Sequence, residues 1–269
     1  MPPILTGNVC IFGAGGPVGA AAASSLKDHY TLRLTDVRPL SDIARDGIPQ
    51  SPGAPLPVPL GPPHACRVVD VSDYAQVLDA ALGMDALINV TVVRTDPVQA
   101  FRVNVLGAFN VAKAAVACGI RRVIHTGPLY KIAEIEADYA HDFDIPDDAP
   151  VRSGTGLYAI TKHLAEGVMR TFAARAGLEV LTFRFSSFLP GDGGAAKDGR
   201  GVGPFTISWE DTGEAFLSGL RAPDMPRPYE PFFICAGLPH GKYSPARAER
   251  LLGWKPQDTF ERLYRKNSE

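Results

Sequence analysis

The sequence VCIFGAGGPVG, which spans Val9 to Gly19, decides the fold because a short apolar run ends abruptly at a cluster of glycines. Such a run bounded by glycines indicates a buried strand. The small apolar residues at 17–26 predict a helix packed closely on this strand, and the segment at 31–36 predicts a second strand. Strand, glycine-rich turn, helix and strand form the opening unit of a doubly wound α/β fold.

The same alternation continues up to Pro190. Four more strands are expected at 67–71, 86–90, 122–125 and 179–185, and three more helices at 74–82, 98–118 and 157–176. Seven prolines at 48–64 exclude a regular helix there, so we expect an extended surface loop, as a linker between strands in preference to a partner-binding segment. A second, acidic loop is expected at 134–148.

The pattern is less regular after Pro190. A glycine-rich loop at 191–203, a helix at 210–220, proline-rich turns and a short helix at 245–252 are expected. The sequence therefore predicts the α/β class, with a Rossmann-type doubly wound parallel sheet of six strands over residues 1–190. Residues 191–269 are expected to form a small, irregular C-terminal substrate-binding part packed on that domain.

Composition restricts the class of protein further. The 269 residues carry a formal net charge of −2, which gives no indication of a nucleic-acid partner. The four cysteines, Cys10, Cys66, Cys118 and Cys235, are widely spaced, so we expect no zinc site and a reducing compartment. The chain shows neither a signal sequence nor an apolar run of the ~20 residues that a membrane span needs. A cytoplasmic protein without a membrane partner is expected.

The glycine cluster predicts a site for the phosphates of a dinucleotide. Gly13, Gly16 and Gly19 have the spacing that permits a tight turn, a close approach of pyrophosphate to the backbone, and close packing of helix on strand. Pro17 and Val18 begin the helix, whose free N–H groups and positive dipole end attract phosphate.

An acidic residue follows at the end of the second strand. Asp36 lies about twenty residues after the glycines, where a carboxylate binds the adenosine ribose hydroxyls and repels a 2′-phosphate. This favours NAD over NADP as cofactor, although Arg38 is close enough to soften the preference. The alternative is that Asp36 only caps a turn.

Tyr158 and Lys162 are four residues apart at the start of a strongly predicted helix and therefore lie on one face of it. A lysine ammonium lowers the pKa of a neighbouring phenol, which can then exchange a proton with a substrate hydroxyl or carbonyl near neutral pH. Lys162 can also bind a cofactor ribose. The pattern occurs by chance in many helices and becomes specific only because it follows a dinucleotide-binding turn.

These features together resemble an extended short-chain dehydrogenase/reductase of the NAD-dependent epimerase/dehydratase family. The resemblance is carried by GAGGPVG, LTDVRP, VVDVSD, ALINV, FRVNVLGAFNVAKAA, RRVIHT, LYAITKHLAE, LTFRFSSFLPG and RLLGWKP. It implies an enzyme with Tyr158 as general acid/base, Lys162 as its partner and NAD as cofactor. It also implies cofactor contacts for Asp70 and Val71 near the adenine, Asn89, Val90 and Thr91 after the fourth strand, and Phe185 and Ser186 beside the nicotinamide, with Asn104 supporting the site.

Two departures from the family pattern concern the substrate. Gly127 and Pro128 stand where the family has adjacent serines that bind the reacting oxygen, so Thr126 is the candidate for that role, with His125 as a weaker one. The chain is also short for a nucleotide-sugar enzyme and resembles the uronate dehydrogenases in this respect, which implies a small sugar or sugar-acid substrate. A substrate carboxylate could then meet Lys197 or Arg200, unless both are only solvated loop charges.

Three functions fit these observations. The first is a dehydrogenase that releases NADH, the second is an epimerase or dehydratase that recycles its cofactor, and the third is a non-enzymatic dinucleotide sensor, which the missing serine suggests. By analogy, a homodimer is expected through the helices at 98–118 and 157–176.

Overall fold

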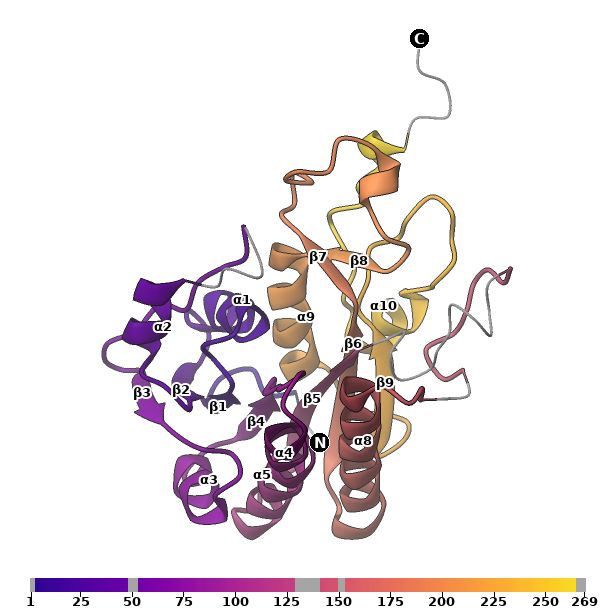
Figure 1. The fold of residues 1–269 in the computed structure, drawn as a ribbon. Coiled ribbons are helices and arrows are strands. Elements are labelled where there is room, and N and C mark those ends of the chain that lie inside the picture. Colours follow the sequence, from indigo (N-terminus) through magenta and orange to yellow (C-terminus); the bar gives the residue numbers. More distant parts are fainter. Residues whose placement is uncertain (1–2, 48–52, 129–140, 150–152, 265–269) are drawn as a thin grey trace.

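A single seven-stranded parallel sheet forms the centre of the computed structural model, which describes residues 3–47, 53–128, 141–149 and 153–264 (Figure 1). The strand order is β3-β2-β1-β4-β5-β6-β9, and every neighbouring pair is parallel. The strands are β1 (Asn8–Phe12), β2 (Thr31–Asp36), β3 (Ala65–Val68), β4 (Ala86–Asn89), β5 (Arg122–Pro128), β6 (Glu179–Phe185) and β9 (Tyr229–Phe233). This order confirms the predicted doubly wound Rossmann-type fold.

Helices cover both faces of the sheet because its strands are apolar on both faces. Val9 and Ile11 pack into the core on the side of α1 (Pro17–Leu26) and α9 (Trp209–Arg221), whereas Cys10 and Phe12 pack into the core on the other side. That second layer consists of α3 (Tyr74–Ala81), α5 (Gly107–Ala117) and α8 (Leu157–Ala176) (Figure 1).

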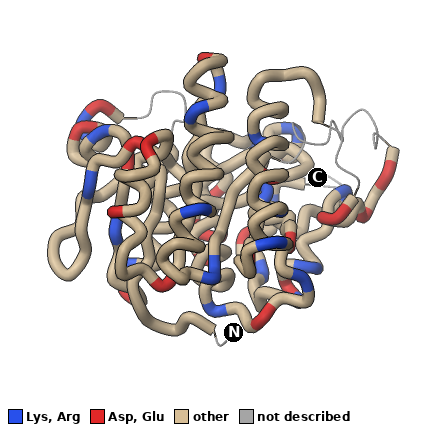
Figure 2. Tube along the Cα trace, turned by 90° about the horizontal axis from the view of Figure 1, so that it is seen from below, with Lys and Arg blue, Asp and Glu red and all other residues tan. Residues whose placement is uncertain are grey.

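Shorter elements connect these layers. They are α2 (Leu40–Asp46), α4 (Pro97–Ala100), η1 (Phe101–Leu106), β7 (Ser187–Leu189), η2 (Gly199–Gly201), β8 (Thr206–Ser208), α10 (Ala246–Leu252) and η3 (Glu261–Leu263). β7 and β8 pair in parallel beyond the carboxyl end of β6 (Figure 1). Seen from below, basic and acidic residues are interspersed along the trace, as expected for a net charge of −2 (Figure 2).

The main sheet has one strand more than the six predicted, and the separate β7–β8 pair is not predicted by the sequence either. Proline-rich turns are expected after α9, but residues 229–233 form β9, which pairs with β6 at the edge of the sheet. Pro231 is tolerated in β9 because an edge strand leaves every second N–H without a strand partner. α9 and β9 therefore extend the layers of the main sheet.

Two further expectations need adjustment. The helix expected at 98–118 consists of α4, the π-helical segment η1 and α5, a change of winding that has no signal in the sequence. The third strand is Ala65–Val68 rather than 67–71. The described part of the proline-rich segment, 53–64, contains neither helix nor strand, and its first residues, 48–52, lie outside the described residues, as do 134–140 of the acidic loop. Within the described chain, no helix is long and apolar enough to span a membrane.

The reversal of strand order between β1 and β4 positions the site. In open parallel sheets, ligands bind beyond the carboxyl ends of the strands at such a switch point. The glycine turn after β1, the loop after β4 and the end of β5 meet there.

Candidate active site

The glycine turn after β1 has the geometry that its spacing predicts. Gly13 has a φ of +89°, and a Cβ on it would lie 3.0 Å from the backbone nitrogen of Thr91. A Cβ on Gly19 would collide with the carbonyl oxygen of Gly13, so this glycine allows α1 to pack against the turn. Gly16 is the N-cap of α1, and Pro17 occupies the first turn of the helix.

Asp36 both supports this turn and faces a crevice. Its carboxylate accepts hydrogen bonds from the backbone N–H groups of Gly15, at 2.9 Å, and Val37, at 2.8 Å. Burial raises the pKa of Asp36, against the opposing effect of these N–H donors. The alternative role as a turn cap is therefore compatible with ligand binding. The side chain of Arg38 is paired with Asp46 of α2 and does not line the crevice.

The crevice beside Asp36 has a volume of about 360 Å³ and is mostly apolar. Seven of the expected cofactor residues line it: Gly13, Gly16, Asp36, Asp70, Val71, Val90 and Thr91. The sequence assigned no role to the others, Val37, Val69, Val92, Val93, Asp96, Gln99 and Val103. Val37 and Val69 directly adjoin expected residues, and Val103 reaches the crevice from η1, where it precedes the expected Asn104. A mostly apolar crevice lined by the Asp36 carboxylate fits an adenosine.

A second cavity, of about 190 Å³, adjoins the first through Val90 and Val92, which line both. Six further expected residues line it: Val18, Thr126, Tyr158, Lys162, Phe185 and Ser186. Its remaining lining residues are Arg94, Gly127, Pro128 and Phe188. The two cavities together form one site that extends from the glycine turn to the Tyr158–Lys162 pair.

Lys162 is buried on α8, one turn after Tyr158. Its Nζ donates a hydrogen bond to the backbone oxygen of Thr91, 3.3 Å away. Burial, together with the positive charge of Arg94, lowers the pKa of Lys162 to about 7. The guanidinium of Arg94 lies over the ring of Tyr158, with Cζ 5.1 Å from the ring centroid.

Two asparagines shape the loop after β4 without lining either cavity. Asn89 Oδ1 accepts hydrogen bonds from the backbone nitrogen of Thr91, at 3.2 Å, and from its Oγ1, at 2.7 Å. Asn104, buried in η1, accepts from Val93 N at 2.9 Å and donates to Val93 O at 2.8 Å and Thr161 Oγ1 at 2.9 Å. Asn104 thus connects the loop that lines the site to α8, the helix that carries Tyr158 and Lys162.

The candidates for the missing serine differ in position. Thr126 lines the small cavity, but its hydroxyl donates a hydrogen bond to the backbone oxygen of Asn89, 3.2 Å away. His125 is fully buried, lies 3.5 Å from the Asn89 amide and lines neither cavity. Its pKa is well below the usual range because burial disfavours the imidazolium.

The two loop cations suggested for a substrate carboxylate lie elsewhere. Arg200 is 92% exposed and forms an ion pair with Asp198 at 3.0 Å. Lys197 is exposed, and neither residue lines the small cavity.

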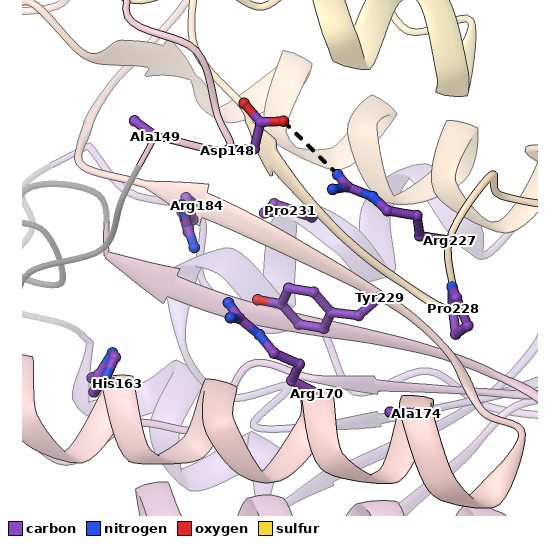
Figure 3. Close-up of a pocket in the computed structure, with 10 residues that line it drawn as sticks. All are labelled: Asp148, Ala149, His163, Arg170, Ala174, Arg184, Arg227, Pro228, Tyr229 and Pro231. Atoms are coloured by element: carbon purple, nitrogen blue, oxygen red, sulfur yellow. Dashed lines mark ion pairs between the residues drawn. The ribbon is translucent and has the colours of Figure 1, made fainter.

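A larger cavity of about 560 Å³ lies between α8 and the edge of the sheet, away from all predicted site residues (Figure 3). Two of its arginines are paired with carboxylates: Arg184 makes two hydrogen bonds to Glu166, and Arg227 lies 2.8 Å from Glu230 and 4.0 Å from Asp148. The guanidinium of Arg170 stacks on Tyr229 at 4.8 Å. The dinucleotide crevice and the tyrosine–lysine pair, rather than this larger cavity, therefore define the candidate active site.

The model of the NAD-dependent epimerase/dehydratase family matches residues 9–200, which include both cavities. The chain belongs to this family. NAD is its cofactor, and the apolar crevice, the unobstructed Gly13–Gly16 backbone and the Asp36 carboxylate fit that molecule.

Individual relatives are distant. A uronate dehydrogenase of Pseudomonas putida is 28% identical over 68% of this chain and 62% of its own length, so the match spans less than two thirds of that protein. An L-arabinose 1-dehydrogenase (NAD(P)(+)) of Haloferax volcanii is 24% identical over 93% of this chain and 96% of its own. The crystal structure of uronate dehydrogenase from Agrobacterium tumefaciens superimposes with a TM-score of 0.73 at 23% identity, covering 94% of this chain and 85% of the other. This similarity confirms the fold.

Proposed function

We propose that this protein is an NAD-dependent dehydrogenase that transfers a hydride from a hydroxyl-bearing carbon of a sugar or sugar acid. One observation carries the proposal: the cavity that holds Tyr158 and Lys162 adjoins the dinucleotide crevice. A small substrate in that cavity would meet the phenol beside the nicotinamide. Both curated relatives described above are dehydrogenases of sugars or sugar acids.

Bound NAD supplies the hydride acceptor. Tyr158 then takes the proton of the substrate hydroxyl as general base. Lys162 in its ammonium form stabilises the phenolate, and its position between Tyr158 and Thr91 suits a contact with the cofactor ribose. Because the pKa of Lys162 is about 7, its charge at neutral pH depends on whether anionic groups enter the site.

Thr126 is proposed to contact the reacting oxygen. Its hydroxyl hydrogen is directed to Asn89 O, so donation to the substrate requires the loss of that bond, which contributes about 1 kcal/mol. We therefore assign Thr126 a smaller contribution than a serine with a free hydroxyl would make. Gly127 and Pro128 have no side-chain donor to replace it.

The remaining cofactor contacts extend this assignment. Asp36 is proposed to bind the adenosine ribose, and Asp70 and Val71 to border the adenine. Phe185 and Ser186 are proposed to border the nicotinamide. Residues after 190 are proposed to supply the substrate-binding part, since β8 and the loop before it follow the strand end that lines the small cavity.

We also propose a cytoplasmic homodimer. Apolar side chains on η1, α5 and α8 are between 40% and 46% exposed, namely Phe101, Leu106, Phe109, Val116 and Leu164. Phe109 of α5 and Phe172 of α8 pack edge to face, so the two helices are in contact at these side chains. Light scattering of the protein and of Phe109→Asp tests the dimer, which the variant should weaken.

The assay for the function mixes purified protein with NAD and a panel of sugars and sugar acids and follows NADH absorbance. A steady rise with one substrate, abolished by Tyr158→Phe, is the expected result. NAD binding without net NADH, together with conversion of a sugar to its epimer or dehydrated product, would instead assign the recycling reaction of the family. Binding without any turnover would assign a sensor.

A further inference from the structure

Arg94 is the residue of the small cavity for which the family resemblance gives no role. It lies in the loop after β4, and its guanidinium packs over the ring of Tyr158, 5.1 Å from the centroid. No carboxylate in the described part of the chain forms an ion pair with it, in contrast to the exposed arginines Arg38, Arg67 and Arg200. A guanidinium that lies over the catalytic tyrosine, with no anionic partner among the described residues, is available to bind an anionic ligand.

The charge that lines the small cavity is one-sided, although Asp96, two residues after Arg94, lines the adjoining crevice. The described lining of the cavity contains two cations, Arg94 and Lys162, and no aspartate or glutamate. The nearest acid along α8, Glu166, is bound by Arg184 at 3.0 and 3.2 Å and by the hydroxyl of Tyr229 at 2.9 Å. Glu166 does not line the cavity, although it raises the pKa of Lys162 against the larger effects of burial and Arg94.

The two cations also affect each other. Arg94 contributes to the low pKa of Lys162, after burial. An anionic group bound to Arg94 would reduce that repulsion and favour the ammonium form of Lys162, the form that lowers the pKa of a phenol. Binding of an anion and activation of the tyrosine would thus be coupled.

We propose that Arg94 binds the negatively charged group of the substrate, a carboxylate or a phosphate, so that the enzyme selects a sugar acid or sugar phosphate over the neutral sugar. The planar guanidinium fork matches either group through two parallel hydrogen bonds. This inference rests on the proposed function, which supplies the sugar substrate. It assigns the carboxylate to Arg94 in place of the loop cations Lys197 and Arg200.

The test compares charged and neutral partners of the same sugar. Glucuronate and glucose, galacturonate and galactose, and glucose 6-phosphate are assayed with wild type, Arg94→Gln, Arg94→Lys and the control Arg121→Gln, an exposed arginine at the opposite end of β5. Loss of charge-assisted hydrogen bonds should lower kcat/KM for the anionic substrate about 10- to 100-fold in Arg94→Gln. Arg94→Lys should recover part of this loss, and the loss for the anionic sugar should exceed that for its neutral partner at least about tenfold, since only the anionic sugar loses the interaction with the charge.

Calorimetry of the same sugars with the NAD complex separates this proposal from the proposed function. If no sugar yields NADH but an acid or phosphate binds and Arg94→Gln removes the binding, the dehydrogenase assignment fails and the role of Arg94 stands. Equal losses for charged and neutral sugars, a preference of wild type for the neutral sugar, or no binding of any anionic probe would overturn it. NAD affinity, measured in parallel, should be the same in all four proteins.

Discussion

Asn104→Ala tests whether η1 holds the loop that lines the site. The wild-type side chain is 1% exposed and makes three hydrogen bonds, two to the backbone of Val93 and one to Thr161. At about 1 kcal/mol net for each bond, the substitution should lower the free energy of unfolding by about 3 kcal/mol. Because Val90 to Val93 line the cofactor crevice, releasing this loop should also weaken NAD binding, by about tenfold if ordering it again costs ~1.4 kcal/mol.

Urea titration at 25 °C gives the first quantity, and calorimetric NAD titration of the folded variant gives the second. The matched control is Thr212→Val in α9, which removes a buried hydrogen bond to Ser208 O of 2.7 Å remote from the crevice. The control should lose about 1 kcal/mol of stability and keep its NAD affinity. If Asn104→Ala loses less than about 1 kcal/mol and binds NAD like wild type, the reasoning that Asn104 orders the site is refuted.

Three further changes test other parts of the site. Gly19→Ala should lower the thermal midpoint and reduce NAD affinity at least about tenfold, because the methyl group meets Gly13 O, whereas Gly167→Ala, in open space on α8, should stabilise by up to about 1 kcal/mol. Asp36→Asn should raise the ratio of kcat/KM with NADP to that with NAD; an unchanged ratio would contradict its role in excluding the 2′-phosphate. Lys162→Met should abolish turnover yet stabilise the NAD-free protein by roughly 1–3 kcal/mol at pH 7. The lowered pKa means that folding disfavours the ammonium, so this gain should be largest at or below pH 7 and should disappear as the pH approaches 10.5; a gain that grows with pH would contradict it.

The parts of the molecule that follow from local rules were predictable from sequence. The turn at Gly13 needs a positive φ, and the close packing at Gly19 excludes a side chain, so both constraints are encoded within eleven residues. α8 occupies the predicted 157–176 because Gly177 adopts a left-handed conformation, with a φ of +72°, and ends the helix.

The parts that depend on distant contacts were not predictable. β9 contains Pro231 and becomes a strand only because β6 offers its free edge some fifty residues away in sequence. The hydrogen bond from Gly15 N to Asp36 forms only because two loops meet in the fold. The sequence alone therefore gives Gly15 no role beside Gly13, Gly16 and Gly19. The position of Arg94 is set by the path of the loop after β4, which Asn104 fixes from η1, and no periodic pattern encodes that path.

The absence of the family serine and the presence of Arg94 both concern how the substrate is held and activated beside Tyr158. A donor to the reacting oxygen mainly stabilises charge that develops in the transition state and therefore contributes to kcat. An arginine that binds a remote anionic group positions the substrate before the reaction, and such binding energy can offset the loss of a local donor. In this cavity the local donor is reduced to Thr126, whose proton is directed to Asn89, while the guanidinium of Arg94, which has no carboxylate partner among the described residues, lies over the tyrosine ring. If binding of the anionic group by Arg94 offsets the loss of a strong donor to the reacting oxygen, Thr126→Val should lower kcat with the anionic substrate by less than about tenfold. Arg94→Gln should then act mainly on KM. A large fall in kcat for Thr126→Val with unchanged KM would show instead that Thr126 turns toward the substrate and performs the role of the serine.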